Sequence, residues 1–126
     1  MSPIISKAYG PVSRNDSGIT TIQFNNDLTI DQEIAIDVVE TALKLDPSGK
    51  ALLMMFPGTQ NEWTLPAQQV FAKAKGVKKV AIIFQDKTME KLTKILFRVA
   101  KTIKSDYRMN SFPSRWDAED WLLNGK

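Results

Sequence analysis

Apolar residues fall into short runs along this chain, and their spacing predicts strands at several places. The runs at residues 51–56 and 80–84 do not alternate with polar residues. Short runs of this kind are typical of strands covered on both faces, as at the centre of a parallel sheet. β-branched and aromatic residues at 19–24 favour another strand, and residues 108–112 predict a last one. The pattern therefore indicates a sheet with two fully buried inner strands.

The start of the chain has a weaker strand pattern. Residues 4–12 form an extended segment that Gly10 and Pro11 interrupt. Turn-forming residues are then concentrated at 14–18, and they include Gly18, which can adopt a positive φ at little cost. We expect a β-hairpin that joins the first strand to the strand at 19–24.

Helix signals separate the later strands. Thr29 and Gln32 have the spacing of a capping box ahead of a first helix, and Pro47 and Gly49 mark its end. Three further helices are predicted: from residue 66 to about 75, from about 87 to 104, and from the cap Ser114 to residue 124.

The resulting order of elements is β-β-α-β-α-β-α-β-α. Strands that alternate with helices imply right-handed crossovers and helices packed on a mostly parallel sheet. We therefore expect one α/β domain over residues 1–126, with a mixed sheet of about five strands, a hairpin at its start and four helices.

Composition restricts the chemistry available to this fold. The 126 residues include no histidine and no cysteine. The side chains most often used for proton transfer near neutral pH, thiolate attack and transition-metal binding are therefore missing. We expect no enzyme, no metal and no cofactor. An enzyme of this composition would depend on lysine, tyrosine, serine or carboxylates, and a lysine with a lowered pKa in a cleft would indicate one.

Charge is unevenly distributed. Residues 1–66 carry four basic and eight acidic side chains, and residues 67–126 carry thirteen basic and six acidic ones, which together give the net charge of +3. The first ten residues lack the basic start and apolar core of a signal peptide, and no apolar run approaches the ~20 residues of a membrane-spanning helix. The prediction is a cytoplasmic protein without a transmembrane segment.

The end of the chain resembles a known family. Phe112 and Ser114, then Asp117-Ala118, then Trp121-Leu122 are similar to the terminal F-x-S, E-A and W-L pattern of SpoIIAA-like proteins. These proteins belong to the STAS superfamily of anti-sigma-factor antagonists, which is also grouped with the Sec14-type lipid-binding fold. Residues 79–83 are similar to the strand that precedes the family's long helix. The resemblance extends from about Ile19 to the end, and it implies a β-α superhelix around a small sheet in a single-domain bacterial protein.

The chain departs from this family at one functional position. Anti-sigma antagonists carry a phosphorylated serine at the start of the helix that follows the central strand. The matching region here, residues 57–66, has no serine. The phosphoserine is therefore not transferred to this chain, and Thr59 or Thr64 is the only substitute that the region offers.

A basic stripe is predicted on the long third helix. Its five cations are spaced for one face of the helix: Lys87, Lys91, Lys94, Arg98 and Lys101. This stripe is either a docking surface for an anionic partner or an ordinary solvated face. No aromatic residue is interleaved with it, so we expect no specific nucleic-acid binding.

The loop at 57–66 is the second candidate site. It follows the carboxyl end of a central strand, where open α/β sheets tend to bind ligands. Trp63 in this loop either lines a pocket or caps the core. On the last helix, Trp116 and Trp121 are spaced to point to different sides, and the exposed ring could form a homodimer contact.

These observations predict a non-catalytic binding or regulatory module of the SpoIIAA-like type. It would dock an anionic partner or a small amphipathic, lipid-like ligand through the basic stripe, Thr59, Trp63 and Thr64. The alternative is a protein–protein switch that is similar to the anti-sigma antagonists but lacks their phosphoserine.

Overall fold

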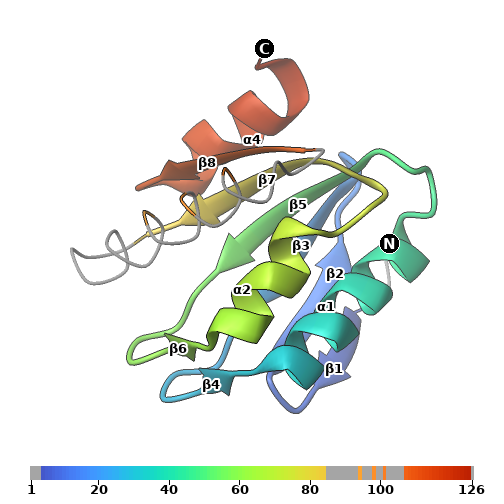
Figure 1. Cartoon of the computed structure of the whole chain (residues 1–126). Helices are drawn as coiled ribbons and strands as arrows, with labels where there is room; N and C mark the ends of the chain where they lie inside the picture. The colour runs from blue at the N-terminus through green and yellow to red at the C-terminus, as the bar shows by residue number, and fades with distance from the viewer. Residues whose placement is uncertain (1–3, 85–93, 95–97, 99–100, 102–106, 126) are drawn as a thin grey trace.

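The computed structural model describes residues 4–84, 94, 98, 101 and 107–125. Its main sheet has six strands in the order β1-β2-β3-β5-β7-β8, and β4 and β6 form a separate two-stranded sheet (Figure 1). The strands are β1 (Ile4–Lys7), β2 (Gly10–Arg14), β3 (Ile19–Gln23), β4 (Thr29–Ile30), β5 (Ala51–Phe56), β6 (Glu62–Trp63), β7 (Val77–Ile83) and β8 (Arg108–Phe112). The described helices are α1 (Gln32–Leu45), α2 (Leu65–Ala72) and α4 (Arg115–Asn124).

The sheet is mixed, as the order of elements predicts. Strands β1, β2 and β3 are antiparallel neighbours, whereas β3, β5, β7 and β8 run parallel. The hairpin between β2 and β3 is confirmed. Its turn is held by Asn15, whose Oδ1 accepts hydrogen bonds from the backbone N–H groups of Ser17 and Ile19, both at 3.0 Å.

The expected count of five strands is wrong, because the segment at 4–12 contains a turn. The chain reverses between β1 and β2, and Gly10, read from the sequence as an interruption, is the first residue of β2. Gly10 has a φ of 140°, and a Cβ at this position would overlap the backbone carbonyl of Gln23. Glycine is needed here, and the reversal adds an edge strand to the sheet.

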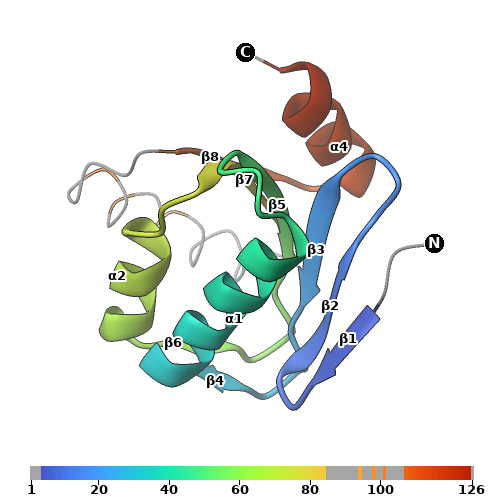
Figure 2. The ribbon, with the colours of Figure 1, turned by 90° about the vertical axis from the view of Figure 1, so that its right-hand side faces the viewer.

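Helices α1 and α2 cover one face of the sheet, and α4 covers part of the other face (Figure 2). Along β5, Leu53 and Met55 belong to the core under α1 and α2, whereas Met54 belongs to the core under α4. In β7, Val80 and Ile82 belong to the first core and Ala81 and Ile83 to the second, so β5 and this part of β7 are apolar on both faces. This confirms the prediction of two inner strands from their non-alternating sequence.

Three of the four expected helices fall within the described residues. The fourth, over residues 87–104, lies outside them except at Lys94, Arg98 and Lys101, each of which is helical. The last helix begins as predicted, with the Ser114 hydroxyl accepting from the N–H groups of Trp116 and Asp117.

The cap predicted for the first helix is wrong. Asp31 caps α1, and its Oδ1 accepts a 2.9 Å hydrogen bond from the N–H of Ile34. Thr29 instead lies in β4, where it pairs with Glu62 of β6. The small sheet moves the start of the helix two residues beyond the predicted cap.

Candidate functional site

Two loops meet where the parallel strands end. The loop at 25–31 follows β3, and the loop at 57–64 follows β5. They are joined by the β4–β6 pairing and by a 2.8 Å hydrogen bond from the N–H of Asp27 to the carbonyl of Thr59. The sequence-predicted site is therefore half of a two-loop assembly.

Asparagine side chains hold this assembly together. Asn61 Oδ1 accepts from the N–H of Gly58 at 2.7 Å, and its Nδ2 donates to the carbonyl of Asn25 at 2.9 Å. Asn26 Oδ1 accepts from the N–H of Thr59 at 2.8 Å. The side-chain amides of Asn26 and Asn61 are thus used within and between the two loops.

Trp63 lies in the core. Only 7% of it is exposed, and its ring packs between those of Phe24 and Phe71, with centroids 5.3 and 5.2 Å away. The sequence left two interpretations open for Trp63, a pocket wall or a cap on the core, and its position is that of a cap on the core. Its Nε1 is buried without a hydrogen-bond partner among the described residues, as is Oε1 of Gln68.

The two threonines of the loop differ in their surroundings. Thr64 is the N-cap of α2, and its Oγ1 accepts a 3.2 Å hydrogen bond from the N–H of Ala67. The side chain of Thr59 is exposed at the loop tip. The structure thus gives Thr64 a structural role in the helix that follows the central strand.

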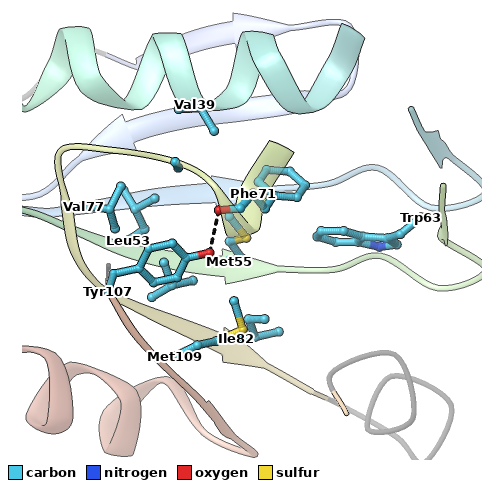
Figure 3. Close-up of a pocket in the computed structure, with 11 residues that line it drawn as sticks. Val39, Leu53, Met55, Trp63, Phe71, Val77, Ile82, Tyr107 and Met109 are labelled. Atoms are coloured by element: carbon cyan, nitrogen blue, oxygen red, sulfur yellow. Dashed lines mark hydrogen bonds between the residues drawn. The ribbon is translucent and has the colours of Figure 1, made fainter. Parts of the chain in front are cut away.

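A small cavity lies beneath α1 and α2, beside Trp63 (Figure 3). Its volume is about 10 Å³, which is room for about one water molecule. The lining is almost wholly apolar: Val39, Leu53, Met55, Trp63, Phe71, Ala74, Val77, Val80, Ile82, Tyr107 and Met109. The Tyr107 hydroxyl donates to the carbonyl of Phe71 at 2.6 Å. A lipid-like ligand would fit only if these side chains moved apart.

Part of the basic stripe can be placed. Lys94, Arg98 and Lys101 are helical and exposed, and their spacing of four and three residues puts them on one helix face. Lys87 and Lys91 lie outside the described residues. The stripe therefore stays a prediction at two of its five positions.

A second group of cations gathers where the parallel strands begin, and we call it the basic edge. Its members are exposed and come from the ends of α1 and α2 and the starts of β5, β7 and β8: Lys44, Lys50, Lys73, Lys75, Lys78 and Arg108. Two contacts show that the starts of β5, β7 and β8 are neighbours. The N–H of Ala51 donates to the carbonyl of Gly76 at 2.9 Å, and residue 79 pairs with Arg108.

The opposite end of the strands is acidic. The two-loop assembly and the start of α1 carry exposed carboxylates, which we call the acidic edge: Asp27, Asp31, Glu33 and Glu62. Acidic residues at helix starts and basic residues at helix ends complement the helix dipole, which accounts for Glu33 and Lys44. Lys50, Lys78 and Arg108 lie outside the described helices, so the dipole does not account for them.

Lys79 is buried on the other side of β7, under α4. Its Nζ donates to the carbonyls of Trp121 at 2.9 Å and Gly125 at 2.5 Å, and it lies 5.2 Å from the centroid of the Trp121 ring. Burial lowers the pKa of this ammonium, and the charges of Lys78 and Arg108 lower it further. Lys79 does not line the cavity. The geometry gives it the role of a cap on the last turn of α4.

An irregularity in the pairing of β5 with β7 gives Lys78 and Lys79 different surroundings. Ala51 pairs with Val77 and Leu52 with Lys79, so Lys78 is an extra residue at this point. Val77 consequently lines the cavity on one face, while Lys79 points to α4 on the other. Two adjacent lysines look alike in the sequence, and only the register of the sheet distinguishes them.

A family model covers this whole arrangement. The model is described as a domain of unknown function, DUF7793, and it matches residues 14–126. The chain belongs to the DUF7793 family. No curated protein matches the chain, and no solved structure matches it.

The DUF7793 match begins at the last residue of β2 and includes both edges, the cavity and α4. Among the residues that the structure describes, no group of three or more acidic side chains is placed to hold a metal ion. Within the same residues, none of the helices is long and apolar enough to span a membrane.

Proposed function

We propose that this chain is a non-catalytic, SpoIIAA-like binding module that acts in the cytoplasm and docks on an anionic partner. The alternation of parallel strands β3, β5, β7 and β8 with helices supports the family resemblance. The observation that carries the proposal is the basic edge, six exposed cations brought together from five segments of the chain. Such a concentration of one sign of charge attracts and orients an oppositely charged partner.

An anionic partner is better supported than a small amphipathic ligand. The cavity holds about 10 Å³, and Trp63, the residue expected to contact a ligand, is packed between two aromatic rings. The basic edge needs no rearrangement to bind, because its side chains are already exposed. The docking surface of this proposal is therefore the basic edge. The part of the stripe at Lys94, Arg98 and Lys101 is a second exposed cationic surface with which the basic edge can be compared.

Two charge-reversed variants with the same net charge test this proposal. The edge variant carries Lys50→Glu, Lys78→Glu and Arg108→Glu, and the stripe variant carries Lys94→Glu, Arg98→Glu and Lys101→Glu. Each is compared with the wild type by the salt concentration that elutes it from immobilised heparin. We expect the edge variant to elute earliest, because it loses half of the basic edge.

Equal elution of the two variants would contradict the proposal, since retention would then depend on net charge and not on a surface. Circular dichroism of each variant provides the folding control. Because all six substituted side chains are exposed, we expect native spectra.

A second candidate function is favoured by the position of Thr64. This residue caps α2 directly after the small strand that follows β5, which is where the anti-sigma antagonists place their phosphoserine. A phosphate at this cap would be stabilised by the dipole of α2. The corresponding function is a protein–protein switch with Thr64, or the exposed Thr59, as its modified residue.

The intact mass of the protein purified from its source cells tests this second function. A fraction heavier by one phosphoryl group is expected, and Thr64→Ala or Thr59→Ala should remove it. A single unmodified mass under all growth conditions would count against the switch.

A further inference from the structure

An exposed leucine lies at the same end of the molecule as the basic edge, and it distinguishes one kind of anionic partner from another. Leu123 is 46% exposed and lies in the last turn of α4. Lys79 holds this turn against the start of β7 through the carbonyls of Trp121, Leu122 and Gly125. An exposed leucine is therefore fixed at the same end of the molecule as Lys78 and Arg108.

From this arrangement, which rests on the proposed function, we infer that the anionic partner is the surface of a phospholipid bilayer. The molecule would stand on its basic edge, with Leu123 at the boundary between headgroups and acyl chains and the acidic edge facing away. Clustered lysine and arginine side chains attract a protein to anionic lipid, and an apolar side chain beside them gains further burial at the boundary with the acyl chains.

The composition of the basic edge agrees with this partner. Five of its six members are lysines and one is arginine. Lysine acts as a point charge toward phosphate, whereas arginine is favoured where bidentate contacts to bases or phosphates give specificity. The edge also has no aromatic member on which an unpaired base could stack. A polynucleotide would gain nothing from an exposed leucine.

The distribution of charge sets the orientation on such a surface. Asp27, Asp31, Glu33 and Glu62 lie at the end of the strands opposite the six cations. The exposed carboxylate of Asp16 lies at the end with the six cations, in the turn before β3, and the cations outnumber it. An anionic plane therefore attracts this end of the molecule and repels the other. Leu123 is thereby presented to the bilayer, whereas Leu65, which is 58% exposed at the start of α2, is held away from it.

A matched pair of leucine variants tests the inference. Leu123→Ser and Leu65→Ser make the same chemical change at opposite ends of the molecule. Co-sedimentation is measured with vesicles of phosphatidylcholine alone and with vesicles that also contain phosphatidylserine. Wild-type protein should bind only the vesicles with phosphatidylserine. Leu123→Ser should weaken this binding about fivefold or more, as the loss of partial leucine burial predicts, and Leu65→Ser should not change it.

Heparin retention of the same variants separates the possible failures. Both leucine variants should elute like the wild type, because heparin has no apolar layer. If Leu123→Ser leaves vesicle binding unchanged while the edge variant loses heparin retention, the bilayer inference is overturned and the proposed function stands. If the edge variant keeps wild-type binding to both heparin and vesicles, both are overturned.

Discussion

The two ends of the parallel strands are built differently. At the acidic edge, two long loops are joined by asparagine side chains, and Trp63 from one of them packs between the rings of Phe24 and Phe71. At the basic edge, the connections are short and the charged side chains extend into solvent. The carboxyl ends of parallel strands are where α/β sheets usually bind ligands. In this protein, the amide groups of Asn26 and Asn61 at that end stabilise the loops, and the opposite end carries the cations on which we propose that a partner docks.

If the acidic edge has mainly a structural role, removing the Trp63 ring should lower the free energy of unfolding more than any other change considered. Trp63→Ala deletes a side chain that is 7% exposed and contacts two other rings, so we expect a loss of roughly 3–5 kcal/mol in the free energy of unfolding. Chemical denaturation measures the change. The control is Trp116→Ala, whose ring is 73% exposed and should cost little. Equal losses in the two variants would contradict a structural role for the two-loop assembly.

Breaking the contact between the loops should have an intermediate effect. Asn61→Ala removes the acceptor for the N–H of Gly58 and the donor to the carbonyl of Asn25. We expect a loss of about 1–3 kcal/mol in the free energy of unfolding. The control is Asn124→Ala, because Asn124 bonds Asp120 in an exposed part of α4 and should contribute far less. A stability equal to that of the control would show that the loops do not depend on Asn61.

A polar contact beside the acidic edge should give the smallest effect. The Tyr9 hydroxyl donates to Asp37 Oδ2 at 2.7 Å, and Lys7 lies 3.3 Å from the same oxygen. The hydrogen bond from Tyr9 is the main reason that the pKa of Asp37 is lowered below its ordinary value of 3.8. In Tyr9→Phe, we expect this pKa to rise toward 3.8, as measured by NMR titration of the carboxyl carbon.

The sign of the accompanying stability change follows from linkage. A carboxyl whose folded pKa is lowered stabilises the fold above its ordinary pKa, and this contribution is lost as pH falls through the folded value. The difference in unfolding free energy between wild type and Tyr9→Phe should therefore shrink as the pH falls below 3.8. A difference that does not vary with pH would contradict the role of Asp37. The effect is small because the Asp37 side chain is 42% exposed.

Several features of this protein are determined locally, and the sequence predicted them. The apolar runs of β5 and β7 predicted inner strands because burial on both faces removes the need for polar positions. Asn15, Gly18 and Ser114 predicted a turn and a cap because their side chains or backbone freedom act over four residues or fewer. The expectation that one of Trp116 and Trp121 is exposed also depended only on helical spacing.

Other features depend on contacts between distant segments, and only the tertiary structure decided them. The sheet register exposes Lys78 and buries Lys79, although the two residues are adjacent and identical. The basic edge joins cations from five segments of the chain, and the sequence did not predict it. The sequence predicted a different group, the basic stripe, because its cations have helical spacing on a single element. The same limit applies to Trp63, since the sequence allowed a pocket or a core position until Phe24 and Phe71 were placed beside it. Charge and burial depend on neighbours in space, and a sequence lists only neighbours along the chain.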